Sequence, residues 1–179
     1  FFIKSIPQAL QNLNWVLNTY DLKEKIPYLV GLLETMVESF KTRIPDFDEE
    51  KLTITLNSFS YKKSVPEDYS GNGGGFVFDC RALPNPGRYD QYRTKTGKDC
   101  AVIQFLDKEI EVQRFIDNAK KLISTSIESY LQRNFEHLMI SFGCTGGQHR
   151  SVYCTEKLSM WVRENYDVNV QTKHYELGD

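Results

Sequence analysis

The chain has 179 residues, of which 40% are hydrophobic and 26% charged, with a formal net charge of −2 and a pI near 6.0. This size predicts a substantial buried core, and the charge balance excludes a globally basic nucleic-acid-binding domain. No apolar run approaches the ~18 residues of a membrane span, and no secretory leader opens the chain, so we expect a cytoplasmic protein.

The cysteines and histidines predict neither a metal site nor a disulfide framework. Four cysteines lack CxxC spacing, and only three histidines accompany them. The phosphate-loop motif GxxxxGK followed by Ser or Thr is also missing, so the sequence does not support ATP hydrolysis. We therefore expect no metal and no cofactor, and four reduced thiols at Cys80, Cys100, Cys144 and Cys154.

The first part of the chain predicts a helical hairpin. Apolar residues recur at helical spacing over residues 6–20 and again over residues 29–40. A stretch with a proline and four acidic residues, 43–50, then breaks the pattern. We interpret residues 1–45 as a helical extension and residues 51–179 as a separate domain. Because the sequence starts at Phe1 without a methionine, we expect it to be part of a longer protein.

Beyond residue 50 the patterns of strands and helices alternate. Apolar residues alternate with polar ones over 52–56, which is typical of a strand with one polar face. Further strands are predicted at 76–78, 138–142 and 168–170, and helices over 112–131 and after residue 151. This order predicts an α/β domain with a mostly parallel sheet and flanking helices.

The segment 141–151, which reads SFGCTGGQHRS, has the composition of an anion-binding loop. It joins a predicted strand to a predicted helix, so backbone N–H groups and the positive end of the helix dipole would face one spot. Gly143, Gly146 and Gly147 permit close backbone approach, while hydroxyls and a guanidinium add donors to phosphate. The alternative is an ordinary tight turn with a helix cap.

A second polar group follows the predicted strand at 76–78. Ligands of parallel sheets bind beyond the carboxyl ends of the strands, so this group should meet the 141–151 loop. Arg81 would be a second phosphate clamp, Asp79 an acceptor for a hydroxyl or an amine, and Asn85 an orienting amide. The alternative is a polar turn in which Asp79 and Arg81 pair only with each other.

The spacing of Cys144 and Arg150 also fits the CX5R loop of cysteine phosphatases. A thiol at a helix N-terminus beside an arginine should have a lowered pKa and become nucleophilic. Such an enzyme needs a general acid for the leaving group, and Asp79, Asp90 and Asp99 are candidates. This interpretation stays open as an alternative to simple binding.

Three sequence blocks lie within residues 51–175: residues 76–86 (FVFDCRALPNP), Thr96-Gly97 and residues 143–153 (GCTGGQHRSVY). In this order they resemble the C-terminal domain of the RapZ family of bacterial RNase adapter proteins, and the resemblance extends over 51–175. The resemblance implies a phosphofructokinase-subdomain-like fold and a regulatory domain that senses glucosamine-6-phosphate. It places Thr145, Gly146 and Arg150 in the sugar-phosphate pocket. The predicted binding residues are Asp79, Arg81, Asn85, Cys144, Thr145, Gly146, Gly147, His149, Arg150 and Ser151.

The sequence departs from the family pattern at three places. Gly87 and Arg88 follow the Asn-Pro pair where the family usually has a histidine first, so one pocket contact is lost or replaced. Gln148 stands where lysine is frequent, and the acidic end at 175–179 replaces a basic tail. Both losses weaken the prediction of an RNA partner, since affinity for the phosphate backbone comes from clustered Lys and Arg.

We therefore expect a binding domain rather than an enzyme, with an RNA or protein adapter module as another alternative. Residues 1–45 resemble the closing helices of an aminoglycoside-phosphotransferase-like kinase, as in bacterial fusions of such a kinase to this domain. That resemblance implies that the parent protein is a small-molecule phosphotransferase. An exposed remnant of the apolar stripe over 112–131 would support homo-oligomer formation.

Overall fold

The computed structural model describes residues 30–31, 51–72 and 74–177. The chain divides into two units, Phe1–Phe47 and Asp48–Asp179. In the first unit only Val30 and Gly31 are described, both helical, so the predicted hairpin lies outside the described residues. None of the helices in the described ranges is long and apolar enough to cross a membrane.

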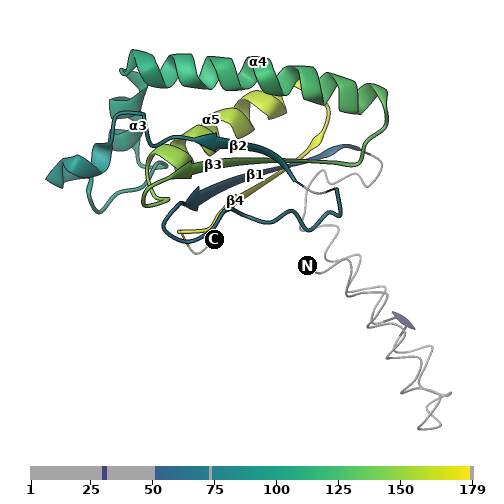
Figure 1. The fold of residues 1–179 in the computed structure, drawn as a ribbon, viewed down its shortest axis with the longest axis horizontal. Coiled ribbons are helices and arrows are strands. Elements are labelled where there is room, and N and C mark those ends of the chain that lie inside the picture. The colour runs from purple at the N-terminus through teal and green to yellow at the C-terminus, as the bar shows by residue number, and fades with distance from the viewer. Residues whose placement is uncertain (1–29, 32–50, 73, 178–179) are drawn as a thin grey trace, which may run out of the picture. The chain divides into compact units, whose positions relative to one another are not determined.

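The second unit is built on four strands that all run in the same direction (Figure 1). The sheet order is β2-β3-β1-β4, which confirms the predicted α/β class with a parallel sheet. The strands are β1 (Thr53–Ser60), β2 (Gly75–Asp79), β3 (His137–Cys144) and β4 (Asn169–His174). The helices are η2 (Pro86–Arg88), η3 (Asp90–Tyr92), α3 (Cys100–Asp107), α4 (Ile110–Gln132) and α5 (Arg150–Asn165).

One face of the sheet forms the core with α4 and α5. Register pairs Ile54 with Leu138 and Leu56 with Ile140, and all four side chains are buried on this face. Apolar residues of α4 recur every three or four positions, so one side of the helix is buried. Its other side leaves Leu122 and Leu131 exposed, and the expected homo-oligomer stays a prediction. The buried α4 residues are Val112, Ile116, Ala119, Ile123 and Ile127.

A hydrogen-bonded polar cluster joins this core face to α5. His174 at the end of β4 is 2% exposed, and its Nδ1 lies 2.8 Å from Ser58 Oγ. Its Nε2 lies 2.7 Å from the Glu156 carboxylate of α5. Since Ser58 and His174 are buried, these hydrogen bonds satisfy polar groups inside the fold.

The connection from β1 to β2, of which residues 61–72 and 74 are described, is fastened near the start of β3. The Asp68 carboxylate accepts 2.9 Å hydrogen bonds from the N–H groups of Ser70 and Gly74. It also lies 3.9 Å from Nε2 of His137. Burial raises the pKa of Asp68, but these hydrogen bonds outweigh it, so the pKa lies below its usual value.

The partly buried His137 should make the domain less stable in mild acid. Burial lowers its pKa below the ordinary 6.5, because the charged ring is poorly solvated. The unfolded chain therefore takes up a proton first as the pH falls, and stability declines below about pH 6.5. Urea unfolding at pH 7.5 and 5.5 measures this decline, which should be smaller in His137→Gln. An equal decline in both proteins would show that His137 is not the group responsible.

Candidate functional site

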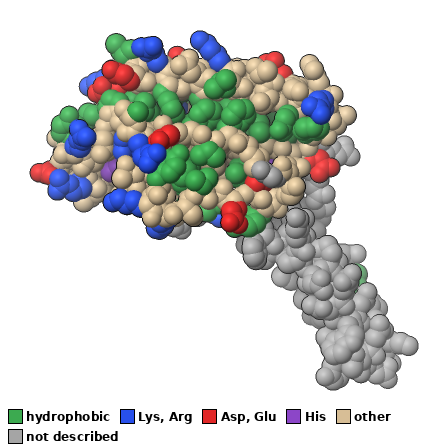
Figure 2. Space-filling view, in the orientation of Figure 1, with side chains coloured by type: hydrophobic (Ala, Val, Ile, Leu, Met, Phe, Trp, Pro, Cys, Tyr) green, Lys and Arg blue, Asp and Glu red, His purple; other side chains and the backbone are tan. Residues whose placement is uncertain are grey.

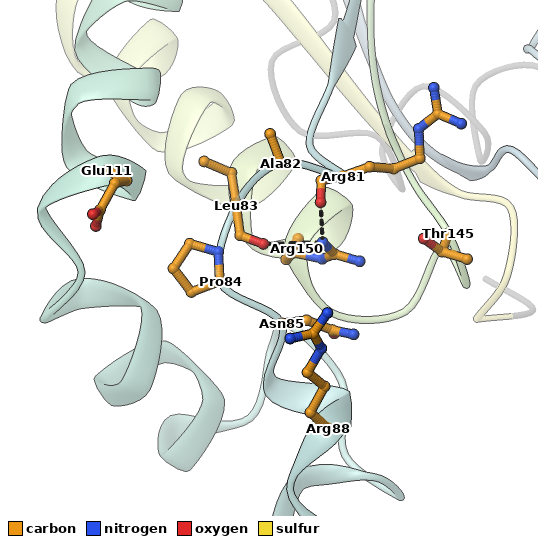
Figure 3. Close-up of a pocket in the computed structure, with 9 residues that line it drawn as sticks. All are labelled: Arg81, Ala82, Leu83, Pro84, Asn85, Arg88, Glu111, Thr145 and Arg150. Carbon is orange, nitrogen blue, oxygen red and sulfur yellow. Dashed lines mark hydrogen bonds between the residues drawn. The ribbon is translucent and has the colours of Figure 1, made fainter.

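Two adjoining hollows lie where β2 and β3 end. Their volumes are about 390 and 240 Å³, and both are lined by Asn85, Thr145 and Arg150. The strand ends predicted to converge do converge here. The first hollow is completed by Arg81, Ala82, Leu83, Pro84, Arg88 and Glu111 (Figure 3), and the second by Gly87, Arg93, Cys144, Gly146, Gln148 and His149.

The loop between β3 and α5 forms the wall of the second hollow. Gly147 has φ +70°, a left-handed conformation that favours glycine, and its N–H donates to Cys144 Sγ at 3.2 Å. Ser60 Oγ fixes the other side by donating to the Thr145 carbonyl at 2.7 Å. α5 starts at Arg150, which lines both hollows, so the positive end of the helix dipole lies beside them.

Arg150 is a buried cation at the junction of the two hollows. The residue is 5% exposed, and Nη1 donates to the carbonyls of Arg81 at 2.7 Å and Leu83 at 3.0 Å. Figure 3 shows the guanidinium between Leu83 and Asn85 with one edge turned toward Thr145. Its Nε has no hydrogen-bond partner among the described residues. The residue therefore fastens the turn after β2 to the start of α5.

Asp79 and Arg81 form an ion pair with each other. Arg81 Nε lies 3.0 Å from both Asp79 oxygens, Nη2 donates to Oδ2 at 2.7 Å, and the guanidinium stacks 4.1 Å from the centre of the Tyr61 ring. The Arg81 hydrogen bond holds the pKa of Asp79 below its usual value. Arg81 lines the first hollow, but Asp79 lines neither hollow. At Asp79 the structure therefore shows the alternative left open by the sequence, a polar turn in which Asp79 and Arg81 pair with each other.

Ser151 and His149 hold the loop in place. Ser151 is fully buried with its Oγ 3.2 Å from Cys144 Sγ, so the hydroxyl predicted to reach a ligand supports the Cys144 thiol instead. His149 lines the second hollow, and its Nε2–H donates to the Tyr92 carbonyl at 2.8 Å. This contact fastens η3 to the loop. Neither Ser151 nor Gly147 lines a hollow.

Four lining residues with polar or charged side chains were not in the set expected from sequence: Arg88, Arg93, Glu111 and Gln148. The departure from the family pattern after the Asn-Pro pair was a signal for Arg88, since a lost contact needs a replacement. Arg93 follows the irregular-looking segment that forms η3, and it pairs with Asp90 at 2.7 Å. Glu111 starts a helix that is distant in sequence, and nothing in the pattern marked it.

The candidate general acids for the phosphatase alternative are all engaged elsewhere. Asp79 pairs with Arg81, and Asp90 with Arg93. Asp99 accepts hydrogen bonds from the N–H and hydroxyl of Thr96 at 2.7 and 2.9 Å, and the backbone bond lowers its pKa. A general acid must be protonated at the working pH, so the lowered pKa values of Asp79 and Asp99 do not suit that role.

Comparison with known proteins identifies the family. A family profile described as the RapZ C-terminal domain matches residues 52–178. The chain belongs to the RapZ family. This confirms the resemblance of residues 51–175, whereas the kinase-like origin of residues 1–45 and the proposed domain limits stay predictions.

Relatives of the RapZ family match most of this chain but only part of themselves. A nucleotide-binding protein of Marinobacter nauticus is 39% identical over 140 residues, which cover 78% of this chain and 46% of that protein. RNase adapter proteins RapZ of Yersinia enterocolitica and Yersinia pseudotuberculosis are 37% identical over 142 residues, covering 79% of this chain and 48% of theirs. The chain thus spans about half the length of the curated relatives it matches.

Proposed function

We propose that this chain is a regulatory domain that binds a phosphorylated small metabolite in the two hollows, most simply an amino-sugar phosphate such as glucosamine-6-phosphate. The observation that carries the proposal is Arg150, a residue only 5% exposed that forms no ion pair among the described residues. A buried charge is costly unless it is paired. A phosphate at the junction of the hollows would supply the partner.

The surroundings of Arg150 match the phosphate end of such a ligand. Arg150, the first residue of α5, and Thr145 line both hollows, and a helix N-terminus and a hydroxyl both suit phosphate oxygens. The larger hollow, about 390 Å³, is within the range of about 300–1,000 Å³ found for small-molecule sites. A hexose phosphate has the size and charge that these walls accept.

Glu111 supports an amine at the other end of the ligand. Among the described residues it is the one carboxylate that lines either hollow, and it lies on the opposite side of the first hollow from Thr145 (Figure 3). A carboxylate on this side of the hollow, opposite Thr145, would repel a second anion and attract an ammonium group. We therefore place the phosphate near Arg150 and the amine toward Glu111.

Isothermal titration calorimetry with glucosamine-6-phosphate, glucose-6-phosphate and glucosamine tests this function. Both phosphates should bind and glucosamine should not, with a preference of about threefold to fivefold for the amino sugar, the size of one exposed ion pair. Glu111→Gln should remove the preference, whereas Glu164→Gln, on an exposed part of α5, should retain it. Failure of both phosphates to bind the wild-type domain would contradict the proposal.

A second candidate is an adapter role, which the name of the Yersinia relatives, RNase adapter protein, favours. On the face shown in Figure 2, Lys and Arg side chains form no continuous surface and hydrophobic side chains occupy the middle. We therefore expect no retained species when the domain is mixed with a stem-loop RNA in a gel-shift assay at about 150 mM salt. A shift that weakens as salt rises would favour the RNA-adapter function instead.

A further inference from the structure

The arginines around the hollows differ in whether their charge is already neutralised. Four of them line the hollows in the described part of the chain: Arg81, Arg88, Arg93 and Arg150. Arg81 pairs with Asp79 and Arg93 with Asp90, each at 2.7 Å. Within residues 51–72 and 74–177, Arg88 and Arg150 form no ion pair. The site thus offers two uncompensated guanidinium groups.

Local structure directs Arg88 toward the hollow. Asn85 caps η2 by accepting the Gly87 N–H at 3.1 Å, and the Tyr89 N–H closes the turn on the Pro86 carbonyl at 2.9 Å. Arg88 is the last residue of this turn, and its side chain extends toward Asn85 and Arg150 (Figure 3). Both arginines line the first hollow together with Asn85. A ligand group beside Asn85 would therefore meet both.

We propose that Arg88 is a specificity-determining residue that matches the second charge of a phosphate dianion. The inference rests on the proposed function and adds to it the charge state of the recognised group. A phosphate monoester carries close to two negative charges at pH 7.5, because its second pKa is about 6. A sulfate monoester has the same tetrahedral shape and carries one charge. Arg150 serves either group, whereas Arg88 favours the phosphate.

Calorimetry at pH 7.5 with glucosamine-6-phosphate and glucosamine-6-sulfate tests this selectivity. The wild-type domain should prefer the phosphate by about tenfold, the effect of one charge-assisted hydrogen bond. Arg88→Gln should lower the phosphate affinity about tenfold, leave the sulfate affinity within about twofold and so abolish the preference. Arg88→Lys should retain most of it. Arg133→Gln removes an equal charge from the far end of α4 and should behave as wild type.

The outcomes separate this inference from the proposed function. If the wild-type domain binds glucosamine-6-phosphate and Arg88→Gln keeps the same ratio of phosphate to sulfate affinity, the role of Arg88 is refuted while the binding function stands. If Arg88→Gln lowers the phosphate and sulfate affinities by the same factor, the role is refuted as well, because Arg88 would then help to hold either ligand without distinguishing their charges. If the wild-type domain binds neither compound, both proposals are overturned.

Discussion

Replacement of Arg150 by alanine should lower the affinity for glucosamine-6-phosphate by at least about a hundredfold, so that calorimetry no longer detects binding. The side chain supplies the buried charge at the junction of the two hollows, and each hydrogen bond to a charged group contributes about 1.5–3 kcal/mol. The change also leaves the carbonyls of Arg81 and Leu83 without their donor, which should cost some stability.

A control on the same helix separates these two effects. Arg163, near the end of α5, also donates to a backbone carbonyl, that of Val170 at 2.7 Å, and lines neither hollow. Arg163→Ala should reduce stability by less than Arg150→Ala, because its hydrogen bond is exposed, and should leave the affinity unchanged. Circular dichroism checks that both variants are folded. A folded Arg150→Ala protein with wild-type affinity would refute the proposed phosphate site.

Replacement of Gly97 by alanine should destabilise the domain by about 1–3 kcal/mol or more and disrupt the site as well. The Gly97 N–H donates to the Gln148 carbonyl at 2.8 Å, and an added Cβ would collide with the His149 carbonyl and the Tyr153 nitrogen. These are backbone atoms at the start of α5, so they cannot move aside without displacing Arg150. The affinity for glucosamine-6-phosphate should therefore fall together with the unfolding free energy.

Urea unfolding of Gly97→Ala beside Gly146→Ala provides the comparison. A Cβ at Gly146 would meet no atom within 4 Å, so this second variant should unfold within about 0.5 kcal/mol of wild type. Equal stability of the two variants would mean that the loop around Gly97 yields more easily than its close packing indicates.

The strands were predictable because their side-chain patterns are dictated by burial. Alternation over 52–56 located β1, and short apolar runs located β2 and β3 to within a few residues at each end. Helix α3 was missed. Its sequence, CAVIQFLD, is a short and mostly apolar run, and a run of this length shows no clear helical period. The contacts of α3 with α4 and η2 stabilise this helix.

The candidate site was predictable only in part because its chemistry depends on pairings across short turns. The sequence identified Thr145 and Arg150, which line both hollows. It could not show that Arg81 turns back onto Asp79, since either residue could have faced the ligand. Nor could it reveal Glu111, which the tertiary packing of α4 brings to the hollow from a separate element.

The order of strands in the sheet has a consequence for synthesis on the ribosome. β1 is the first strand of the domain to be made, yet its two partners are β3 and β4, which begin at His137 and Asn169. It therefore leaves the exit tunnel with both edges unpaired; one edge waits for β3 and the other for β4. Such long-range pairing is slow and leaves strand edges unpaired in the meantime. Nascent chains that stall before residue 169 should therefore be clients of chaperones.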